Sequence, residues 1–225
     1  MDPTHIQPLT RETAPLLILW KSLVQSKLEY CSQLWCPLKT GDIQAIEMVQ
    51  RSFLRKLSCT GHLSYWEQLK SLQLYSLERR RERYRIIYVW RILEGQVPNV
   101  GTQKVVGKWH ERRGRECIPP RVNARAHSQV QKLIYASLAV HGQKLFNTLP
   151  SWLRNITRCS VDSFKRRLDR YLSTVPDEPQ IPGYTAMRRA ESNSLLDMTR
   201  LATASMPGDR ASLVGVVNDI AVDVQ

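Results

Sequence analysis

The sequence predicts a mainly α-helical fold, an irregular helical bundle with a long basic connection and flexible termini. Three observations predict this fold class. Apolar residues recur at helical spacings of three and four through most of residues 13–95 and 131–174. A serine or an aspartate precedes four of these periodic stretches as an N-cap. Glycine and proline gather instead between residues 96 and 130 and beyond Pro176.

Residues 1–12 are expected to be a flexible leader, and the first two helices follow at about 13–28 and 42–57. Pro15 sets the start of the first helix, because proline fits only in a first turn. Asp42 is expected to cap the second helix. The apolar face that this second helix is expected to bury comprises Ile43, Ile46, Val49, Phe53 and Leu57. The opposite, solvated face would carry Gln44, Glu47, Arg51 and Arg55.

Two further helices complete a helical region that spans residues 13–95. Ser64 and Glu67 form a capping box, in which each side chain accepts a hydrogen bond from the backbone of the other residue. Ser76 is expected to cap the next helix, which stops at the following glycine. Its stretch 86–90 is apolar on all sides and by composition could be a strand. Its place inside a longer periodic segment favours a buried half of a helix.

The second half of the chain is expected to be less regular. Residues 96–130 form the basic connection, because they lose helical periodicity and gain glycine, proline and cations. Residues 131–174 form a C-terminal helical region, whose last helix is capped by Ser160. Residues 175–225 are expected to be a linker and a weakly ordered tail. Three tryptophans in apolar stripes are assigned to the core: Trp20, Trp35 and Trp90.

The chain carries a formal net charge of +13, and the excess lies in its middle. Residues 76–172 hold 21 Lys or Arg against 7 Asp or Glu. A segment this basic suits nucleic acid or an anionic membrane surface. The longest apolar run, Pro15–Trp20, is far shorter than the roughly 20 residues that span a bilayer, so no membrane is expected. An odd number of cysteines and no signal peptide predict an intracellular protein of the cytoplasm or nucleus.

Two basic segments are candidates for phosphate contact, which is electrostatic and independent of sequence. One is the arginine-rich helix after Ser76, and the other is the basic connection, where Trp109 and His110 are interleaved for stacking on single-stranded bases. The residues assigned to nucleic-acid binding are Arg79, Arg80, Arg81, Arg83, Arg85, Lys108, Arg112, Arg113, Arg115, Arg121 and Arg125. Two alternatives stay open, namely a solvated helix face braced by Glu78 and Glu82, and a charged disordered loop.

Other side-chain patterns indicate neither catalysis nor a metal site. Cys31 and Cys36 are not followed by a second Cys or His pair, whereas structural zinc needs four closely paired ligands. The five histidines are dispersed, and no glycine-rich phosphate loop occurs. A third basic patch, more typical of an ordinary solvated helix face, comprises Lys165, Arg166, Arg167 and Arg170.

Five fragments in order along residues 16–174 carry a family resemblance. They are Trp20–Val24 with Leu28–Cys31 and Trp35–Pro37, Asp42 and Ile43 with Glu47–Arg51, Leu72 and Leu74 with Ser76–Arg80, Lys144–Pro150, and Ser163–Leu168. Together they resemble the thumb and the downstream helical region of reverse transcriptases from LINE-type, jockey-like non-LTR retrotransposons. The resemblance implies that residues 13–95 are a thumb-like helical region that embraces an RNA–DNA template.

The same resemblance implies what the chain lacks. Polymerases of this family bind two catalytic metal ions on paired palm carboxylates, and this sequence has no Asp-Asp pair. The implied function is therefore that of a nucleic-acid-binding fragment of an RNA-directed DNA polymerase, inactive alone. No cofactor is expected in this chain, and Mg²⁺ is expected only with the missing palm. The implied partners are RNA or RNA–DNA hybrid and the remainder of the polymerase.

Two other functions remain open from the sequence. A helical protein-interaction module would expose apolar surface around Leu16–Trp35, where its helices once packed on the palm, and would self-associate. A degenerate relic of a truncated element would have no nucleic-acid affinity and no selected role. The sequence alone does not separate these alternatives from nucleic-acid binding.

Overall fold

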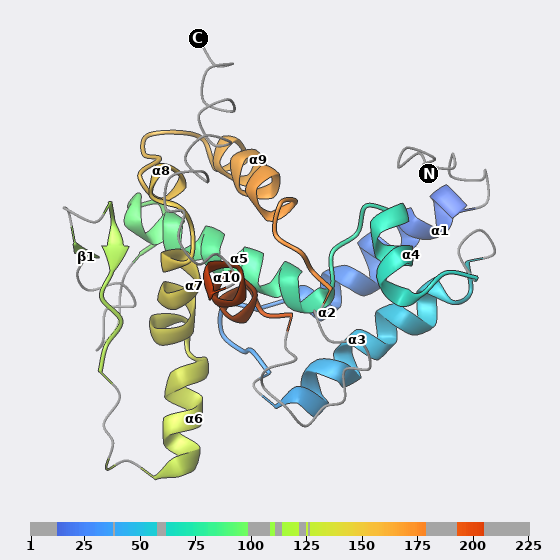
Figure 1. The fold of residues 1–225 in the computed structure, drawn as a ribbon, viewed down its shortest axis with the longest axis horizontal. Helices are drawn as coiled ribbons and strands as arrows, with labels where there is room; N and C mark the ends of the chain where they lie inside the picture. Colours follow the sequence, from blue (N-terminus) through green and yellow to red (C-terminus); the bar gives the residue numbers. More distant parts are fainter. Residues whose placement is uncertain are drawn as a thin grey trace.

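The structure is a computed structural model that describes residues 13–37, 39–57, 62–98, 109–110, 114–121, 125, 127–178 and 193–204. Helices dominate these residues, which confirms a mainly α, irregular helical fold. The leader expected at residues 1–12 lies outside them. Figure 1 shows one long central helix with the helices of the first part of the chain on one side and those of the later part on the other. None of the helices in the described ranges is long and apolar enough to cross a bilayer.

The N-terminal helix runs without a break through three segments. These are α1 (Thr13–Leu19), the π-helical η1 (Trp20–Gln25) and α2 (Ser26–Glu29). The backbone stays right-handed helical at both junctions, so the helix predicted over 13–28 is confirmed. The buried indole of Trp20 stacks on Phe53 with ring centroids 4.5 Å apart, which fixes this helix on the next one.

The next two helices, α3 (Thr40–Leu54) and α4 (Tyr65–Ser71), pack around the smaller of two apolar cores. The capping box of Ser64 and Glu67 at the start of α4 is confirmed, with both reciprocal hydrogen bonds present. The buried residues of this core are Leu17, Leu54, Leu57, Tyr65, Leu69, Leu72 and Leu74.

The start of α3 differs from the prediction. Lys39 occupies the N-cap position and makes no side-chain capping bond, and Asp42 lies inside the first turn. A carboxylate at that place still favours the helix, because the N-terminal end of a helix carries a partial positive charge.

The buried face of α3 also differs from the prediction. Val49 is 42% exposed, whereas Glu47 and Gln50 are buried. Both polar side chains have distant partners: Glu47 accepts a bond from the Leu77 backbone N–H, and the Gln50 amide donates to the Tyr75 carbonyl oxygen at 3.0 Å. Hydrogen bonds to the start of the central helix therefore set the rotation of α3, in place of the apolar stripe.

The central helix is α5 (Leu77–Leu93). Its boundaries are as predicted: the Ser76 hydroxyl accepts a bond from the Arg79 N–H at 3.1 Å, and Gly95, with φ +69°, follows its end. Its apolar stretch is helical and not a strand. The members of that stretch that are buried are Ile86, Ile87, Val89 and Trp90.

The later part of the chain packs around the second half of α5 (Figure 1). Trp90 stacks on Phe164 with ring centroids 4.4 Å apart, and its indole N–H donates to the Ile156 carbonyl oxygen at 2.9 Å. Ser160 caps the last of these helices before the tail, as predicted. The elements are β1 (Trp109–His110), β2 (Glu116–Cys117), α6 (Ser128–Ala136), the π-helical η3 (Leu138–Gly142), α7 (Gln143–Asn147), α8 (Ser151–Arg154), α9 (Val161–Leu172) and α10 (Leu195–Ala204).

The basic connection contains a short strand pair that the sequence pattern did not predict. Strands β1 and β2 are antiparallel, with Trp109 opposite Cys117. The side-chain amide of Asn147 extends the pairing, because it accepts a bond from the Cys117 N–H and donates one to the Cys117 carbonyl oxygen, each at 2.8 Å. The connection is thus attached to α7 at this point.

Two further segments differ from expectation. Helix α10 lies in the expected weakly ordered tail, yet it contacts α7 and buries Leu195 and Met198. Trp20 and Trp90 are core residues, as predicted, whereas Trp35 is 45% exposed. The remaining parts of the tail, residues 179–192 and 205–225, lie outside the described residues.

Candidate nucleic-acid interface

The arginine-rich start of α5 lies in the interior of the protein. Arg79 and Arg85 are 0% exposed, and Arg81 is 3% exposed. Arg80 and Arg83 are partly exposed, and each forms an ion pair. Moving a cation out of water costs several kcal/mol, so a buried guanidinium needs several partners inside the protein. The positions of these partners show what the arginines hold in place.

Arg79 holds the segment around α10 against α5. Its guanidinium donates to the carbonyl oxygens of Pro176 at 2.8 Å and Asn193 at 3.3 Å. Its Nε lies 3.7 Å from the carboxylate of Asp177. One side chain of α5 therefore binds the residues that leave α9 and the residues that enter α10.

Glu82 completes this attachment one helical turn later. Its carboxylate accepts hydrogen bonds from the Ser194 hydroxyl at 2.5 Å and from the Leu195 N–H at 2.8 Å. These bonds satisfy a donor at the start of α10, as an N-cap side chain would. Helix α10 is therefore capped by a residue of α5, far away in the sequence.

Arg81 and Arg85 attach α5 to two other parts of the chain. Arg81 donates to the carbonyl oxygens of Leu28 at 2.6 Å and Trp35 at 2.7 Å, and its guanidinium carbon lies 3.7 Å from the centroid of a Trp35 ring. Arg85 donates to the Ala136 carbonyl oxygen at 2.5 Å. These cations thus satisfy the carbonyl groups at the ends of α2 and α6.

The two partly exposed arginines form bidentate ion pairs. Arg80 binds both carboxylate oxygens of Glu29, and Arg83 binds both oxygens of Asp169 at 2.5 and 2.7 Å. Both acidic residues belong to other helices, α2 and α9. The α5 arginines therefore fasten helices together, in the manner of neither a phosphate-binding surface nor a solvated helix face.

This arrangement corrects the assignment of three α5 residues to phosphate contact. A buried guanidinium does not reach a nucleic-acid backbone in this structure, and the buried residues are Arg79, Arg81 and Arg85. Arg80 and Arg83 keep some exposed surface, but their charges are balanced by Glu29 and Asp169.

Acidic side chains gather around the start of α5. Burial raises the pKa of Glu82 to about 7, although Arg79 and the hydrogen bonds from α10 oppose the rise. Burial likewise raises the pKa of Glu47 to about 7, against the hydrogen bond from Tyr65. Burial raises the pKa of Glu78 well above its ordinary value, and the two neighbouring glutamates add to the effect. Burial therefore favours the protonated form of all three carboxyl groups.

The basic connection is only partly described. Lys108, Arg112 and Arg113 lie outside the described residues. Arg121 and Arg125 lie at exposed positions. Of the six members of the predicted set in this connection, the structure thus describes three: Arg115, Arg121 and Arg125.

Arg115 of the connection contacts two other segments. Its guanidinium forms an ion pair with Glu94 at 2.8 Å and donates to the Ile156 carbonyl oxygen at 3.2 Å. Its φ of 49° places it in the left-handed region, directly after Gly114 with φ 63°. Like the α5 arginines, it fastens two segments together.

The outer face of α9 carries the best-defined unpaired cations. Arg166, Arg167 and Arg170 are exposed, and they form no ion pair within the described part of the chain. The two acidic residues of α9 already have partners, since Asp162 binds Lys165 and Asp169 binds Arg83. The buried face of the same helix comprises Phe164, Leu168 and Leu172.

Sequence reasoning described this patch as an ordinary solvated face. The α9 sequence differs from that of α5 in the regular spacing of its apolar residues. This spacing places the α9 arginines on the face opposite the core. Arg170 lies beside both Arg166 and Arg167 on the helix surface, because residues three and four apart are neighbours.

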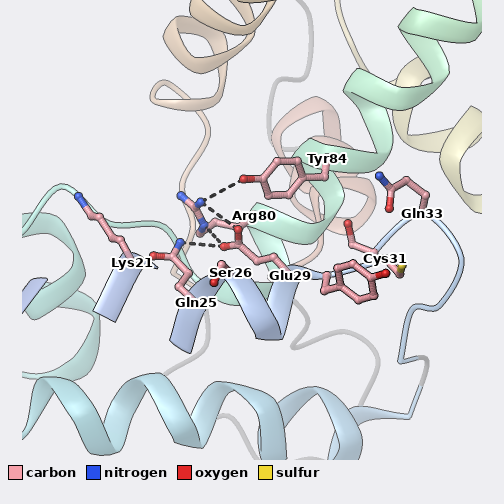
Figure 2. A pocket seen from close by; sticks show the side chains of 10 residues that line it. Lys21, Gln25, Ser26, Glu29, Cys31, Gln33, Arg80 and Tyr84 are labelled. Carbon is pink, nitrogen blue, oxygen red and sulfur yellow. Dashed lines mark hydrogen bonds and ion pairs between the residues drawn. The ribbon is translucent and has the colours of Figure 1, made fainter. Parts of the chain in front are cut away.

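A polar pocket of about 400 Å³ lies between the N-terminal helix and α5. Figure 2 shows Lys21 at one end of the pocket, Cys31 and Gln33 at the other, and Arg80 and Tyr84 between them. Glu29 stands below Arg80 and also accepts a hydrogen bond from the Gln25 amide at 2.7 Å. The full lining is Lys21, Gln25, Ser26, Glu29, Tyr30, Cys31, Ser32, Gln33, Arg80 and Tyr84.

The N-terminal helix and the turn after it expose a series of large apolar side chains. Exposed fractions reach 67% for Ile18 and 82% for Leu34. The other members of this apolar surface are Leu16, Leu19, Leu23, Tyr30 and Trp35. An apolar surface around Leu16–Trp35 is what the sequence predicted for an interaction module. Exposed apolar surface beyond scattered single side chains is typical of interaction sites.

Comparisons with known proteins leave the family open. No family model, no curated protein and no solved structure matches this chain. Within the described residues, no group of three or more His, Cys, Asp or Glu side chains is placed to hold a metal ion.

Proposed function

We propose that this chain is a nucleic-acid-binding helical module, a C-terminal fragment of a LINE-type reverse transcriptase that is inactive without its palm. The phosphate-contacting surface that we propose is the outer face of α9, in place of the α5 arginines. The observation that carries the proposal is a set of three exposed arginines without a carboxylate partner in the described residues: Arg166, Arg167 and Arg170. Its partners are RNA or RNA–DNA hybrid.

The physical argument concerns which cations are available to a polyanion. A cation that is already ion-paired must break that pair before it binds phosphate, so its net contribution to binding is small. The α9 arginines can bind phosphate without breaking an ion pair of the described residues. Arg158, exposed just before α9, adds a further cation near the same end of the molecule. Phosphates bound here would release counterions, and affinity would fall steeply with salt.

The test is a salt series of binding to an RNA–DNA hybrid, measured by fluorescence anisotropy. The variant Arg166→Gln, Arg167→Gln, Arg170→Gln is expected to weaken binding at low salt. The slope of log affinity against log salt should fall by about two to three, since each duplex phosphate contact contributes about 0.9. An unchanged slope would contradict the proposal.

A control variant separates the place of the charges from their number. Lys27→Gln, Arg55→Gln, Lys56→Gln removes the same charge from exposed positions on the other side of the molecule, on α2 and just after α3. We expect this control to keep most of the affinity and the slope. Equal losses in the two triple variants would indicate a general charge effect and would argue against an α9 site.

A second function is favoured by the apolar surface of the N-terminal helix. Leu16, Leu19 and Leu23 are exposed and spaced by three and four residues, as in a helix that packs on another helix. We propose as the alternative that this helix packs on another protein body, which in the implied parent enzyme would be the palm. This function requires no nucleic-acid affinity.

Sedimentation velocity over a range of concentrations tests this alternative. The isolated chain is expected to self-associate, because the apolar surface has no partner. Leu19→Lys with Leu23→Glu should abolish the self-association while leaving the fold intact, since both side chains are exposed. A chain that stays monomeric at high concentration and binds RNA–DNA hybrid would exclude the alternative.

A further inference from the structure

The polar pocket between the N-terminal helix and α5 has an oriented cation in its wall. Arg80 uses its Nε and Nη2 on the two oxygens of Glu29, and Nη2 also lies 3.5 Å from the Tyr84 hydroxyl. Its remaining nitrogen, Nη1, has no partner within the described residues. A guanidinium held in this way by a carboxylate presents a fixed N–H donor, and such donors suit phosphate oxygens.

A second cation stands at the end of the same pocket. Lys21 is exposed and forms no ion pair in the described ranges, and Figure 2 shows it on the Arg80 side of the lining. The lining holds these two cations and one carboxylate, Glu29. Two positive charges and one negative charge leave the pocket with a single net positive charge, which matches the single negative charge of a phosphodiester. An uncharged or cationic ligand would leave that charge without a counterion.

The pocket also offers aromatic and amide groups. Tyr30 is 73% exposed although it lines the pocket, and Tyr84 forms another part of the wall. The turn that carries Tyr30 is fixed, because its carbonyl oxygen accepts a bond from the Trp35 indole at 3.0 Å and Cys31 follows with φ 54°. An exposed aromatic face beside cations is how proteins stack unpaired bases. The amide of Gln33 can both donate to and accept from a base edge.

We propose that this pocket binds one unstacked nucleotide of a single-stranded nucleic acid, with the phosphate between Lys21 and Arg80 and the base on Tyr30. A volume of about 400 Å³ is within the range of small-ligand sites and suits one nucleotide. The inference rests on the proposed nucleic-acid-binding function and adds to it a site for a strand end or an unpaired base. Duplex binding at α9 does not require the pocket.

The experiment uses the full chain and a single-stranded tetranucleotide labelled with 5-iodouracil. Irradiation is expected to crosslink the base to the peptide that contains Tyr30, as mapped by mass spectrometry. Tyr30→Leu should weaken tetranucleotide binding about tenfold, since one base–aromatic stack contributes about 1–3 kcal/mol. Lys21→Gln should lower the salt slope by about 0.7, the contribution of one single-strand phosphate. Both residues are exposed and lie outside the core, so we expect both variants to fold.

Matched controls locate the effect and separate this proposal from the previous one. Tyr135→Leu removes another exposed tyrosine, on α6, and should leave tetranucleotide binding unchanged. The α9 triple variant should weaken hybrid binding and keep the Tyr30 crosslink. Inorganic phosphate should compete weakly, and a phosphotyrosine peptide should not compete. Crosslinks that map only outside the pocket, or equal affinity of Tyr30→Leu and wild type, would overturn the proposal while leaving α9 binding intact.

Discussion

Two arginine-rich helices in this protein use the same side chain in opposite ways. In α5 the arginines are buried or ion-paired and hold other segments by their carbonyl and carboxylate groups. In α9 three arginines lie opposite the buried face and have no ion pair in the described residues. Charge density along the sequence is similar in the two helices. Their roles differ because α5 is surrounded by other elements and α9 is covered on one face only.

The comparison shows that an arginine cluster is not by itself a binding surface. Each buried α5 arginine is matched to carbonyl oxygens at a helix end or turn, which are acceptors that would otherwise be unsatisfied. A planar guanidinium with five donors is suited to this role. Of these two helices, α9 is the one whose exposed arginines keep a charge that no carboxylate of the described residues balances.

The largest expected effect comes from removing one buried cation. Arg79→Met keeps the volume but leaves Asp177 and the Pro176 and Asn193 carbonyl groups without their partner. We expect a loss of about 3–5 kcal/mol in the free energy of unfolding, measured by urea denaturation. The matched change on α9, Arg167→Met, should alter it by less than about 0.5 kcal/mol.

Equal free energies of unfolding for Arg79→Met and Arg167→Met would contradict the different roles that we assign to the arginines of α5 and α9. A more local outcome is that only α10 unfolds in Arg79→Met, which hydrogen exchange of the same variant can reveal. Hydrogen exchange of α10 in Arg79→Met should rise toward the unfolded rate, because Asn193 lies directly before that helix.

A smaller effect is expected from pH, through the buried glutamates near Arg79. Burial raises the pKa of Glu47 and Glu82 to about 7, so the folded protein keeps protons that the unfolded chain releases near its ordinary glutamate pKa of about 4.3. The folded state therefore binds more protons between these values. Stability should fall as pH rises from about 5 to about 7 and then level off, by about 1–3 kcal/mol in total.

Urea denaturation at several pH values tests this prediction. Glu82→Gln keeps one oxygen that can accept from the Leu195 N–H and places an amide NH₂ beside the Ser194 hydroxyl, whose oxygen can accept from it. The variant removes the ionisation, so its stability should depend less on pH than that of the wild type. Arg167→Gln on α9 should keep the wild-type dependence. A stability that rises through this pH range in the wild type would mean that these glutamates are ionised in the folded state.

The sequence predicted the elements whose causes are local. Ser64, Ser76 and Ser160 cap their helices as expected, because an N-cap needs only a side-chain oxygen and the next turn of backbone. The stretch 86–90 is a buried part of a helix as expected, since its length and flanks already favoured that reading.

The burial of the α5 arginines could not be predicted in the same way. Arg79 and Arg85 are held by backbone carbonyl groups from residues 51 to 114 positions away, and a carbonyl leaves no mark in the side-chain pattern. Glu47 is buried for a related reason, because its partners are the backbone of α5 and the hydroxyl of Tyr65. The α9 patch was visible in the sequence, but its lack of ion pairs depends on Arg83 of α5 binding Asp169.

The smallest effects on the free energy of unfolding are expected from substitutions of the two aspartates of α9, which have different partners. Asp169 pairs with the mostly buried Arg83, whereas Asp162 pairs with Lys165 on the helix surface, where its side chain is 83% exposed. Asp169→Asn should lower the free energy of unfolding by about 1 kcal/mol, because it leaves a largely desolvated arginine unpaired. Asp162→Asn should lower it by about 0.5 kcal/mol or less, since surface pairs at this spacing contribute little. Both changes remove one negative charge from α9, so RNA–DNA hybrid affinity at low salt should rise in both. If the two variants lost equal stability, the pairing of α9 with α5 would be no stronger than an ordinary surface contact.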